Sequence, residues 1–141
     1  MASKIAGLIA ISLLLWVAPH VMSSETEKEA AALSAALAWL DRVDQGSYAE
    51  SWQAAAEYFK TAVNKDQWVE SLKAGRAPLG KLVSRAVGAK SYQTALPGAP
   101  DGEYVVIQFK TAFENKKAAL ETVTPMREAN GTWRVSGYYI K

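Results

Sequence analysis

The spacing of apolar residues changes once along this chain, close to residue 80, and that change limits the folds open to it. Before this point, apolar side chains recur every three or four residues, which is the spacing of an amphipathic helix. After it, apolar and polar residues alternate, as in a strand with one buried face. Pro78 and Gly80 stand at the boundary, and both residue types interrupt regular structure. The sequence therefore predicts a helical half followed by a β half.

Three helices are predicted in the helical half. The first begins among acidic residues 25–29, which favour a helix N-terminus through the macrodipole, and it ends at Gly46. Residues 47–50 have the Ser-x-x-Glu form of a capping box, so a second helix is expected through Trp52 to about Tyr58 or Ala62. Residues 64–67 repeat that form and open a third helix, which ends at Gly75. The apolar face of the first helix consists of Leu33, Ala36, Leu37, Leu40 and Val43.

Four strands are predicted in the β half, over residues 82–95, 104–113, 118–127 and 132–140. In the second strand, alternation places Val105, Ile107, Phe109 and Phe113 on one side. In the third strand, Leu120, Thr122 and Thr124 face away from Glu121 and Val123. Asn130-Gly131 predicts a tight hairpin before the last strand, because both residue types tolerate positive φ.

Short connections between these elements predict one α+β domain, residues 24–141, with N-terminal helices packed on a curved four-stranded antiparallel sheet. A twisted sheet that curls around its helices leaves room for a pocket between the two layers. This order of elements resembles the cystatin-like and nuclear-transport-factor-2-like folds. Such folds host many functions, so the resemblance implies architecture alone.

The first 23 residues have the order of a secretory signal peptide: a cation at Lys4, an apolar run over residues 5–18 and a short stretch of small residues. Cleavage is expected after Ser23. The apolar run is shorter than the roughly 20 residues that span a bilayer, so no permanent membrane span is expected after cleavage. The alternative is an uncleaved N-terminal anchor. Both interpretations predict a folded domain outside the cytoplasm, periplasmic or secreted.

Several short motifs, taken in order, resemble the domain-of-unknown-function 4019 family over nearly all of residues 24–141. They lie at residues 38–40, 48–52, 67–69, 76–80, 97–104, 121–123 and 131–140. The resemblance implies a small exported bacterial protein with the fold described above. It implies no activity, substrate or catalytic residue.

The chain contains no cysteine, and its one histidine, His20, lies in the expected leader. A thiolate nucleophile, an imidazole base and a zinc site of the usual ligands therefore have no residues to form them in the processed protein. No metal and no cofactor is expected. The net charge of +2 falls to +1 without Lys4, which argues against a nucleic-acid partner.

Charge and aromatic residues nevertheless suggest a binding site. Residues 71–100 carry five cations and no acid, so this segment could attract an anionic ligand or an anionic membrane surface. Aromatic residues of the two short helices would lie beside its loop at residues 76–80. The alternatives are that these cations pair with acids inside the fold and that the tryptophans belong to the core. The candidate binding residues are Trp52, Tyr58, Trp68, Arg76, Lys81 and Arg85.

Glu121 is the candidate for acid–base chemistry, with Tyr58, Tyr92 or Tyr104 as the hydrogen-bond donor. A strand glutamate also commonly pairs with a cation, here Arg134 or Arg85. The preferred hypothesis is a non-catalytic binding or interaction module of the bacterial envelope, for a small ligand or a protein partner. The alternatives are a carboxylate-dependent isomerase or hydrolase that uses the same pocket, and a structural homodimer formed through the sheet face.

Overall fold

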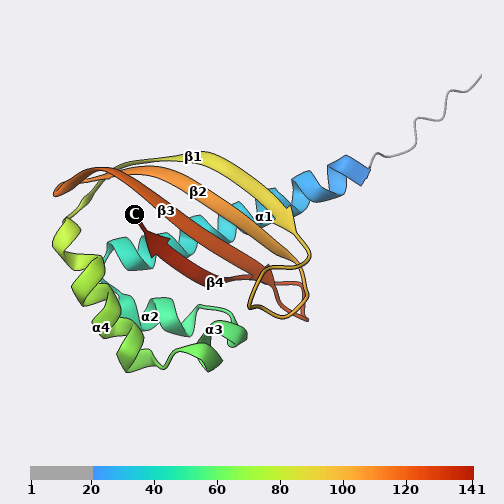
Figure 1. Ribbon diagram of the computed structural model, residues 1–141, viewed down its shortest axis with the longest axis horizontal. Helices are drawn as coiled ribbons and strands as arrows, with labels where there is room; N and C mark the ends of the chain where they lie inside the picture. Colours follow the sequence, from blue (N-terminus) through green and yellow to red (C-terminus); the bar gives the residue numbers. More distant parts are fainter. Residues whose placement is uncertain (1–20) are drawn as a thin grey trace, which may run out of the picture.

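The computed structural model describes residues 21–141, so the expected leader lies outside the described residues except for positions 21–23, which begin the first helix. Four helices, a short 3₁₀ turn and four strands follow one another (Figure 1). The helices are α1 (Val21–Asp44), α2 (Tyr48–Gln53), α3 (Glu57–Ala62) and α4 (Lys65–Gly75), and the 3₁₀ turn is Ala77–Leu79. The strands are β1 (Leu82–Gln93), β2 (Tyr104–Phe113), β3 (Lys116–Arg127) and β4 (Trp133–Ile140).

The four strands form one antiparallel sheet in the order β1-β2-β3-β4, so each strand pairs with its neighbour in sequence. The sheet curves around α1, which contacts all four strands, while α2, α3 and α4 lie beyond the β4 edge (Figure 1). The predicted α+β class, with helices on one face of a four-stranded sheet, is confirmed. The more specific likeness to cystatin-like or nuclear-transport-factor-2-like folds stays a prediction. Within residues 21–141, no helix is both long and apolar enough to cross a membrane.

The core lies between α1 and the inner face of the sheet. The alternation predicted for β2 is confirmed, because Val105, Ile107, Phe109 and Phe113 are all at most 1% exposed. Small residues on α1, Ala32 and Ala36 among them, are fully buried and let the helix approach the sheet closely. Truncating a core aromatic such as Phe109 to alanine would therefore cost about 3–5 kcal/mol, since the cavity could not collapse fully. Leu37, predicted on the apolar face of α1, is 44% exposed instead.

The prediction of a single second helix was wrong, because the chain breaks at residues 54–56 and forms α2 and α3. Ala55 and Ala56 are fully buried, and the backbone N–H of Ala56 donates to the carbonyl of Val135 in β4 at 2.8 Å. The N–H of Glu57, at the start of α3, donates to the Glu128 carboxylate at 2.9 Å. Contacts with the β3–β4 hairpin thus fix a bend that local helical spacing does not reveal.

The two predicted capping boxes have different outcomes. At Asn64 the box is present: the Asn64 side chain accepts from the backbone of Gln67, and the Gln67 side chain accepts from the backbone of Asn64. At Ser47 the side chain makes no capping hydrogen bond. Glu50 is exposed in the first turn of α2, where its negative charge still interacts favourably with the helix dipole.

The β3–β4 hairpin forms where Asn130-Gly131 predicted it, although only Gly131 uses positive φ, at +86°. Its loop is closed by backbone hydrogen bonds from Gly131 to Glu128 and from Glu128 to Thr132. The loop is therefore longer than a two-residue turn, and the last strand begins at Trp133.

Candidate binding site

Arg85 lies between two carboxylates in a cluster at the end of the sheet where β1 begins. Its guanidinium donates to Glu121 at 2.7 and 3.2 Å and to Asp44 at 2.8 and 3.0 Å. Glu121 is fully buried, whereas the side chains of Arg85 and Asp44 are 9% and 13% exposed. Strand β1 supplies the arginine, β3 supplies the glutamate and the last residue of α1 supplies the aspartate. Four charge-assisted hydrogen bonds therefore join three separate elements.

Arg76 joins the same cluster from the end of α4. It donates to Asp44 at 3.2 Å and to the carbonyl of Gly80 at 2.6 Å, and its guanidinium lies 4.3 Å from the centre of the Phe113 ring. The residue is only 3% exposed. We call Asp44, Arg76, Arg85 and Glu121 the buried charge cluster. Because its two cations face its two carboxylates, neither predicted arginine is left to bind an external anion.

The acid–base hypothesis for Glu121 required a carboxylate oxygen that faces a substrate. Both oxygens instead accept from protein donors: Arg85 and Thr111 on one, and Arg85 and Tyr138 on the other. Burial, followed by the neighbouring Glu121 charge, raises the pKa of Tyr138 well above its ordinary range, which keeps the phenol a donor. Hydrogen bonds to Asp44 and then Glu121 outweigh the burial of Arg85 and raise its pKa. The structure therefore gives Glu121 the paired environment expected with Arg85, whereas Arg134 does not contact it.

The tyrosines considered as partners of Glu121 make their hydrogen bonds elsewhere. Tyr92 donates to Glu103 at 2.9 Å, and Tyr58 donates to the carbonyl of Gly98 at 2.9 Å. Tyr104 donates to the carbonyl of Pro100. Tyr138, which the sequence did not single out, is the tyrosine that bonds Glu121.

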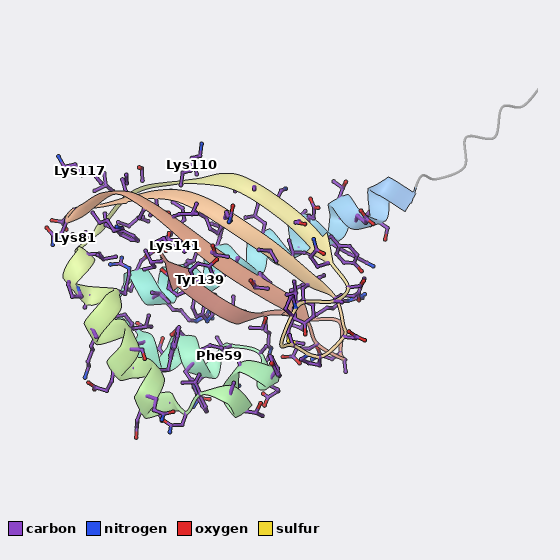
Figure 2. All side chains as sticks on the ribbon, in the orientation of Figure 1. Phe59, Lys81, Lys110, Lys117, Tyr139 and Lys141 are labelled. Carbon is purple, nitrogen blue, oxygen red and sulfur yellow. The ribbon has the colours of Figure 1, made fainter. Side chains whose placement is uncertain are left out.

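The other predicted binding residues are separated from one another. Trp68 is 8% exposed in the core, where its ring packs edge-on against Phe59 at 4.8 Å, and its indole N–H donates to Ser51. Trp52 donates to the carbonyl of Val63 and lies under Lys60. Lys81 is exposed after the 3₁₀ turn that follows α4, apart from Phe59 in α3 (Figure 2). The structure brings Arg76 and Arg85 together but does not gather the six residues into one site.

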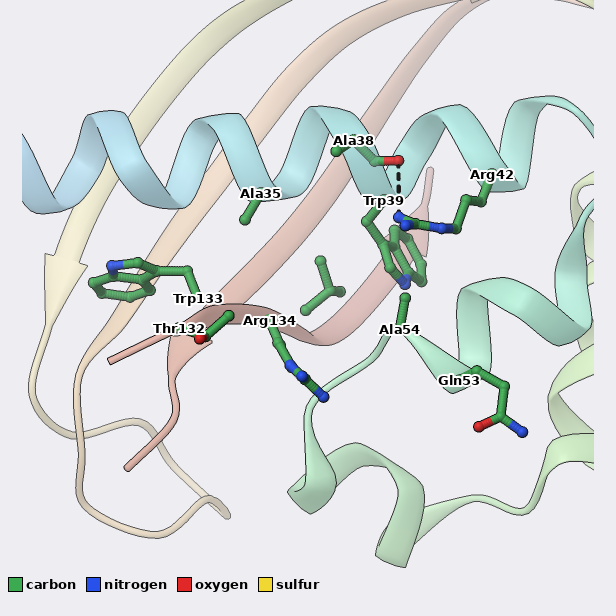
Figure 3. A pocket seen from close by; sticks show the side chains of 10 residues that line it. Ala35, Ala38, Trp39, Arg42, Gln53, Ala54, Thr132, Trp133 and Arg134 are labelled. Atoms are coloured by element: carbon green, nitrogen blue, oxygen red, sulfur yellow. Dashed lines mark hydrogen bonds between the residues drawn. The ribbon is translucent and has the colours of Figure 1, made fainter. Parts of the chain in front are cut away.

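A different pocket opens between α1, the end of α2 and the start of β4 (Figure 3). Its volume is about 310 Å³. Two arginines line it, Arg42 from α1 and Arg134 from β4, and two tryptophans flank them. The full lining is Ala35, Ala38, Trp39, Arg42, Gln53, Ala54, Thr132, Trp133, Arg134 and Val135. We call this hollow the α1–β4 pocket.

Local sequence explains why the pocket is hollow. Ala35 and Ala38 on α1 are too small to fill the space above β4, and the break after α2 leaves Ala54, with Gln53 beside it, at the other wall. Trp39 forms a fixed floor, because its indole N–H donates to the carbonyl of Ser51 at 2.8 Å and the residue is 2% exposed. The helix break that the sequence failed to predict therefore creates one side of the pocket.

The α1–β4 pocket is rich in hydrogen-bond donors and contains no carboxylate. Arg42 makes one long hydrogen bond, 3.3 Å, to the carbonyl of Ala38 one turn earlier (Figure 3). Among residues 24–141, the side chain of Arg134 has no hydrogen-bond or ion-pair partner, although the residue is half-buried. The side chains of Gln53, Thr132 and Trp133 add further donors at the rim. Two unneutralised guanidiniums in one concave site favour an anionic guest.

A smaller hollow, about 190 Å³, lies between α4 and β4. Trp68, Leu72, Arg76 and Tyr138 line it, but the polar groups of Arg76 and Tyr138 are directed to the buried charge cluster. Across the part of the chain that the structure describes, no group of three or more acidic, histidine or cysteine side chains could hold a metal ion.

The comparisons with known proteins give one match. A family model described as "Protein of unknown function (DUF4019)" matches residues 35–138. No curated protein and no solved structure matches the chain. The matched region includes every residue that lines the α1–β4 pocket and every member of the buried charge cluster.

Proposed function

We propose that this chain, which belongs to the DUF4019 family of proteins of unknown function, is an exported binding module that holds a small anion in the α1–β4 pocket. The observation that carries the proposal is the pairing of Arg42 and Arg134 in one pocket whose lining contains no acid. The ligand class is a small molecule with a carboxylate or phosphate group.

The empty pocket has an electrostatic cost. Two guanidiniums that face one hollow repel each other, and an anion between them would remove that repulsion. Arginine presents its N–H groups in a planar fork that matches two oxygens of a carboxylate or phosphate. Each such charge-assisted hydrogen bond contributes about 1.5–3 kcal/mol in a partly buried site. The pocket thus offers both affinity and a preferred orientation for the anionic group.

The size and walls of the pocket restrict the rest of the ligand. A volume of about 310 Å³ is at the lower end of the range for small-molecule sites. Trp133 is half-buried at one wall and offers a flat apolar surface on which a ring or a short carbon chain can pack. These features favour a compact organic acid or phosphate ester over a polymer.

The proposed location outside the cytoplasm rests on the sequence. A cation, an apolar run and small residues at positions 1–23 are typical of export, which supports a location in a bacterial envelope or outside the cell. A cysteine-free domain needs no disulfide-forming machinery there. Binding is proposed in place of catalysis because the pocket lining contains no carboxylate, histidine or cysteine to act as an acid, base or nucleophile.

The test is calorimetric titration of the full chain with inorganic phosphate, succinate and benzoate, and with neutral succinamide as the uncharged comparison. We expect at least one anion to bind and succinamide not to bind. Arg134→Gln should weaken that binding more than tenfold, because it removes a charge-assisted contact. Arg127→Gln is the matched control, since it removes the same charge from the same hairpin outside the pocket.

Two outcomes would overturn the proposal. One is that none of the three anions binds the protein. The other is that Arg134→Gln and Arg127→Gln weaken anion binding equally, which would mean that the anion responds to net charge and not to the pocket.

A further inference from the structure

Lysines gather on the outer face of the sheet, the face that no helix covers. Lys110 and Lys117 project from it on the side away from the helices, and Lys141 lies at the end of β4 (Figure 2). These three lysines line one shallow depression together with Ser84, Thr111, Ala112, Ala118, Ala119 and Leu120. We call this surface the lysine face.

Strand register explains why Lys110 and Lys141 meet although they are far apart in sequence. Lys110 of β2 is paired with Leu120 of β3. On the other side of Leu120, its backbone exchanges two hydrogen bonds of 2.9 Å with Lys141. Directly opposed residues of antiparallel strands project on the same face, so these residues form a row across the sheet with an apolar side chain at its centre.

The positive charge of this surface is not neutralised by neighbouring acids. Within residues 24–141, none of Lys110, Lys117 and Lys141 forms an ion pair, and no aspartate or glutamate side chain lines the depression. Glu121 is adjacent to Leu120 in sequence, but it points to the inner face and is held by Arg85. Lys81 lies nearby together with Glu114 of the β2–β3 turn, whose N–H donates to the Lys81 carbonyl and whose carboxylate accepts the Lys81 N–H, so this pair adds no net charge to the surface.

The residue types indicate what kind of partner fits. Protein interfaces are enriched in arginine and aromatic side chains and depleted in lysine. A second copy of the chain that docked through the same face would set lysine against lysine, and that arrangement is repulsive. Lysine ammonium groups act as point charges on flexible side chains, so they can adjust to the changing positions of phosphates in a lipid surface. Tyr139, 51% exposed beside Lys141, is of a type that settles at membrane interfaces.

We propose that the lysine face docks the protein on anionic phospholipid. The surface shares no lining residue with the α1–β4 pocket, so a membrane-bound molecule keeps that pocket free. The inference does not depend on the proposed anion ligand, because different residues carry it.

The test uses the absence of native cysteine to place one reporter at a time on the full chain. Ala118→Cys carries an environment-sensitive dye inside the depression, and Ala74→Cys carries the same dye on the exposed side of α4. Vesicles contain phosphatidylcholine alone or with phosphatidylglycerol. We expect a blue shift of the Ala118→Cys dye with phosphatidylglycerol vesicles, no shift with neutral vesicles, and no shift at position 74 with either. Because the reporter is local, insertion of the leader elsewhere does not imitate this signal.

Charge-removal variants complete the test. Replacing Lys110, Lys117 and Lys141 together by glutamine should weaken the vesicle response roughly 100-fold, given the typical contribution of one lysine near an anionic surface. The matched control replaces Lys65, Lys73 and Lys90 by glutamine, which removes the same net charge from other surfaces and should change the response less than threefold. Raising the salt concentration from 0.1 to 0.5 M should release the protein, because such attraction is screened.

The proposal is overturned if the dye at position 118 does not shift with phosphatidylglycerol vesicles, if position 74 shifts equally, or if the two triple variants respond alike. A shift produced by soluble polyglutamate but not by vesicles would also overturn it, since the partner would then be an acidic polymer. Formation of a dimer that buries position 118 without lipid would assign the face to a second copy.

Discussion

Two pairs of arginines in this domain occupy opposite environments. Arg76 and Arg85 lie in the buried charge cluster, where Asp44 and Glu121 accept their hydrogen bonds. Arg42 and Arg134 lie in the α1–β4 pocket, where no carboxylate neutralises them. An arginine is costly to bury without an anion, so the first pair brings its anions from within the fold. Arg42 and Arg134 are half-buried and lack a neutralising carboxylate, and we infer that an external ligand supplies their anion.

This difference separates a stabilising role from a binding role for the same residue type. In the buried charge cluster, removing one partner leaves an uncompensated charge inside the protein. In the pocket, removing one arginine reduces the repulsion between the two guanidiniums and leaves no buried charge without a partner. Substitutions in the buried charge cluster should therefore lower the free energy of unfolding, whereas substitutions of the pocket arginines should weaken anion binding and leave stability nearly unchanged.

The largest effect is expected from Glu121→Leu. This change leaves Arg85, Thr111 and Tyr138 without their shared acceptor, and breaking a buried ion pair in this way costs about 3–5 kcal/mol. Urea unfolding of the wild-type and variant chains would measure the loss in the free energy of unfolding. A loss of unfolding free energy below about 1 kcal/mol would show that the cluster tolerates Arg85 without Glu121, and the stabilising role assigned to the buried charge cluster would be wrong.

A smaller loss, about 2 kcal/mol, is expected from Arg85→Lys. The charge remains, but one ammonium group cannot reproduce the four hydrogen bonds that the guanidinium makes to Asp44 and Glu121. The same unfolding experiment checks this value. A lysine variant as stable as the wild type would mean that charge alone, without the arginine geometry, holds the cluster together.

The ion pairs around Glu103 are intermediate between the buried charge cluster and the α1–β4 pocket, because their charges are paired but lie at the surface. Hydrogen bonds from Lys28, then Tyr92 and Arg127, lower the pKa of Glu103 to about 2 from its ordinary 4.5. The ionised form is therefore the one that the fold favours, and its contribution to stability is complete above about pH 4.5 and disappears as the pH falls to about 2. We expect the difference in melting temperature between wild type and Glu103→Gln to shrink over that range. A constant difference from pH 6 to pH 2 would contradict the assignment.

The smallest effect on stability is expected from Arg134→Gln. Because Arg134 has no partner among residues 24–141, its loss should change the free energy of unfolding by less than about 0.5 kcal/mol. A slight gain would follow from reduced repulsion with Arg42. A loss above about 2 kcal/mol would show that Arg134 supports the fold, and the binding role would lose its basis.

The sequence predicted the parts of this structure that local rules determine. Alternation correctly put Glu121 and Val123 on the same face of β3, which the structure shows to be the inner one, and the residues 104–113 assigned to the second strand match β2. The Asn64 capping box formed because its partner, Gln67, is three residues away on the same helix. Such contacts are readable because both members lie within one turn or one strand.

The parts that failed depend on residues distant in sequence. The break between α2 and α3 is fixed by Val135 and Glu128, so helical spacing near residue 55 held no sign of it. The six predicted binding residues were grouped by sequence proximity, whereas the pairing of Arg76 and Arg85 with Asp44 arises from the packing of α1 against the sheet. Arg42 and Arg134 were not selected for the pocket, because 92 positions of chain separate them. The one available signal was the Trp-Arg pair at 133–134, which alternation places at the start of an edge strand.

The central claim is that Arg42 and Arg134 are open to an external anion, whereas Arg76 and Arg85 are occupied. The most direct measurement is nuclear magnetic resonance of the arginine Nε–H groups of the ¹⁵N-labelled chain, titrated with the tightest-binding anion among phosphate, succinate and benzoate. We predict saturable shifts of the Arg42 and Arg134 signals, with those of Arg76 and Arg85 unchanged. Equal shifts of all arginine signals, Arg127 included, or shifts confined to Arg76 and Arg85, would contradict this account.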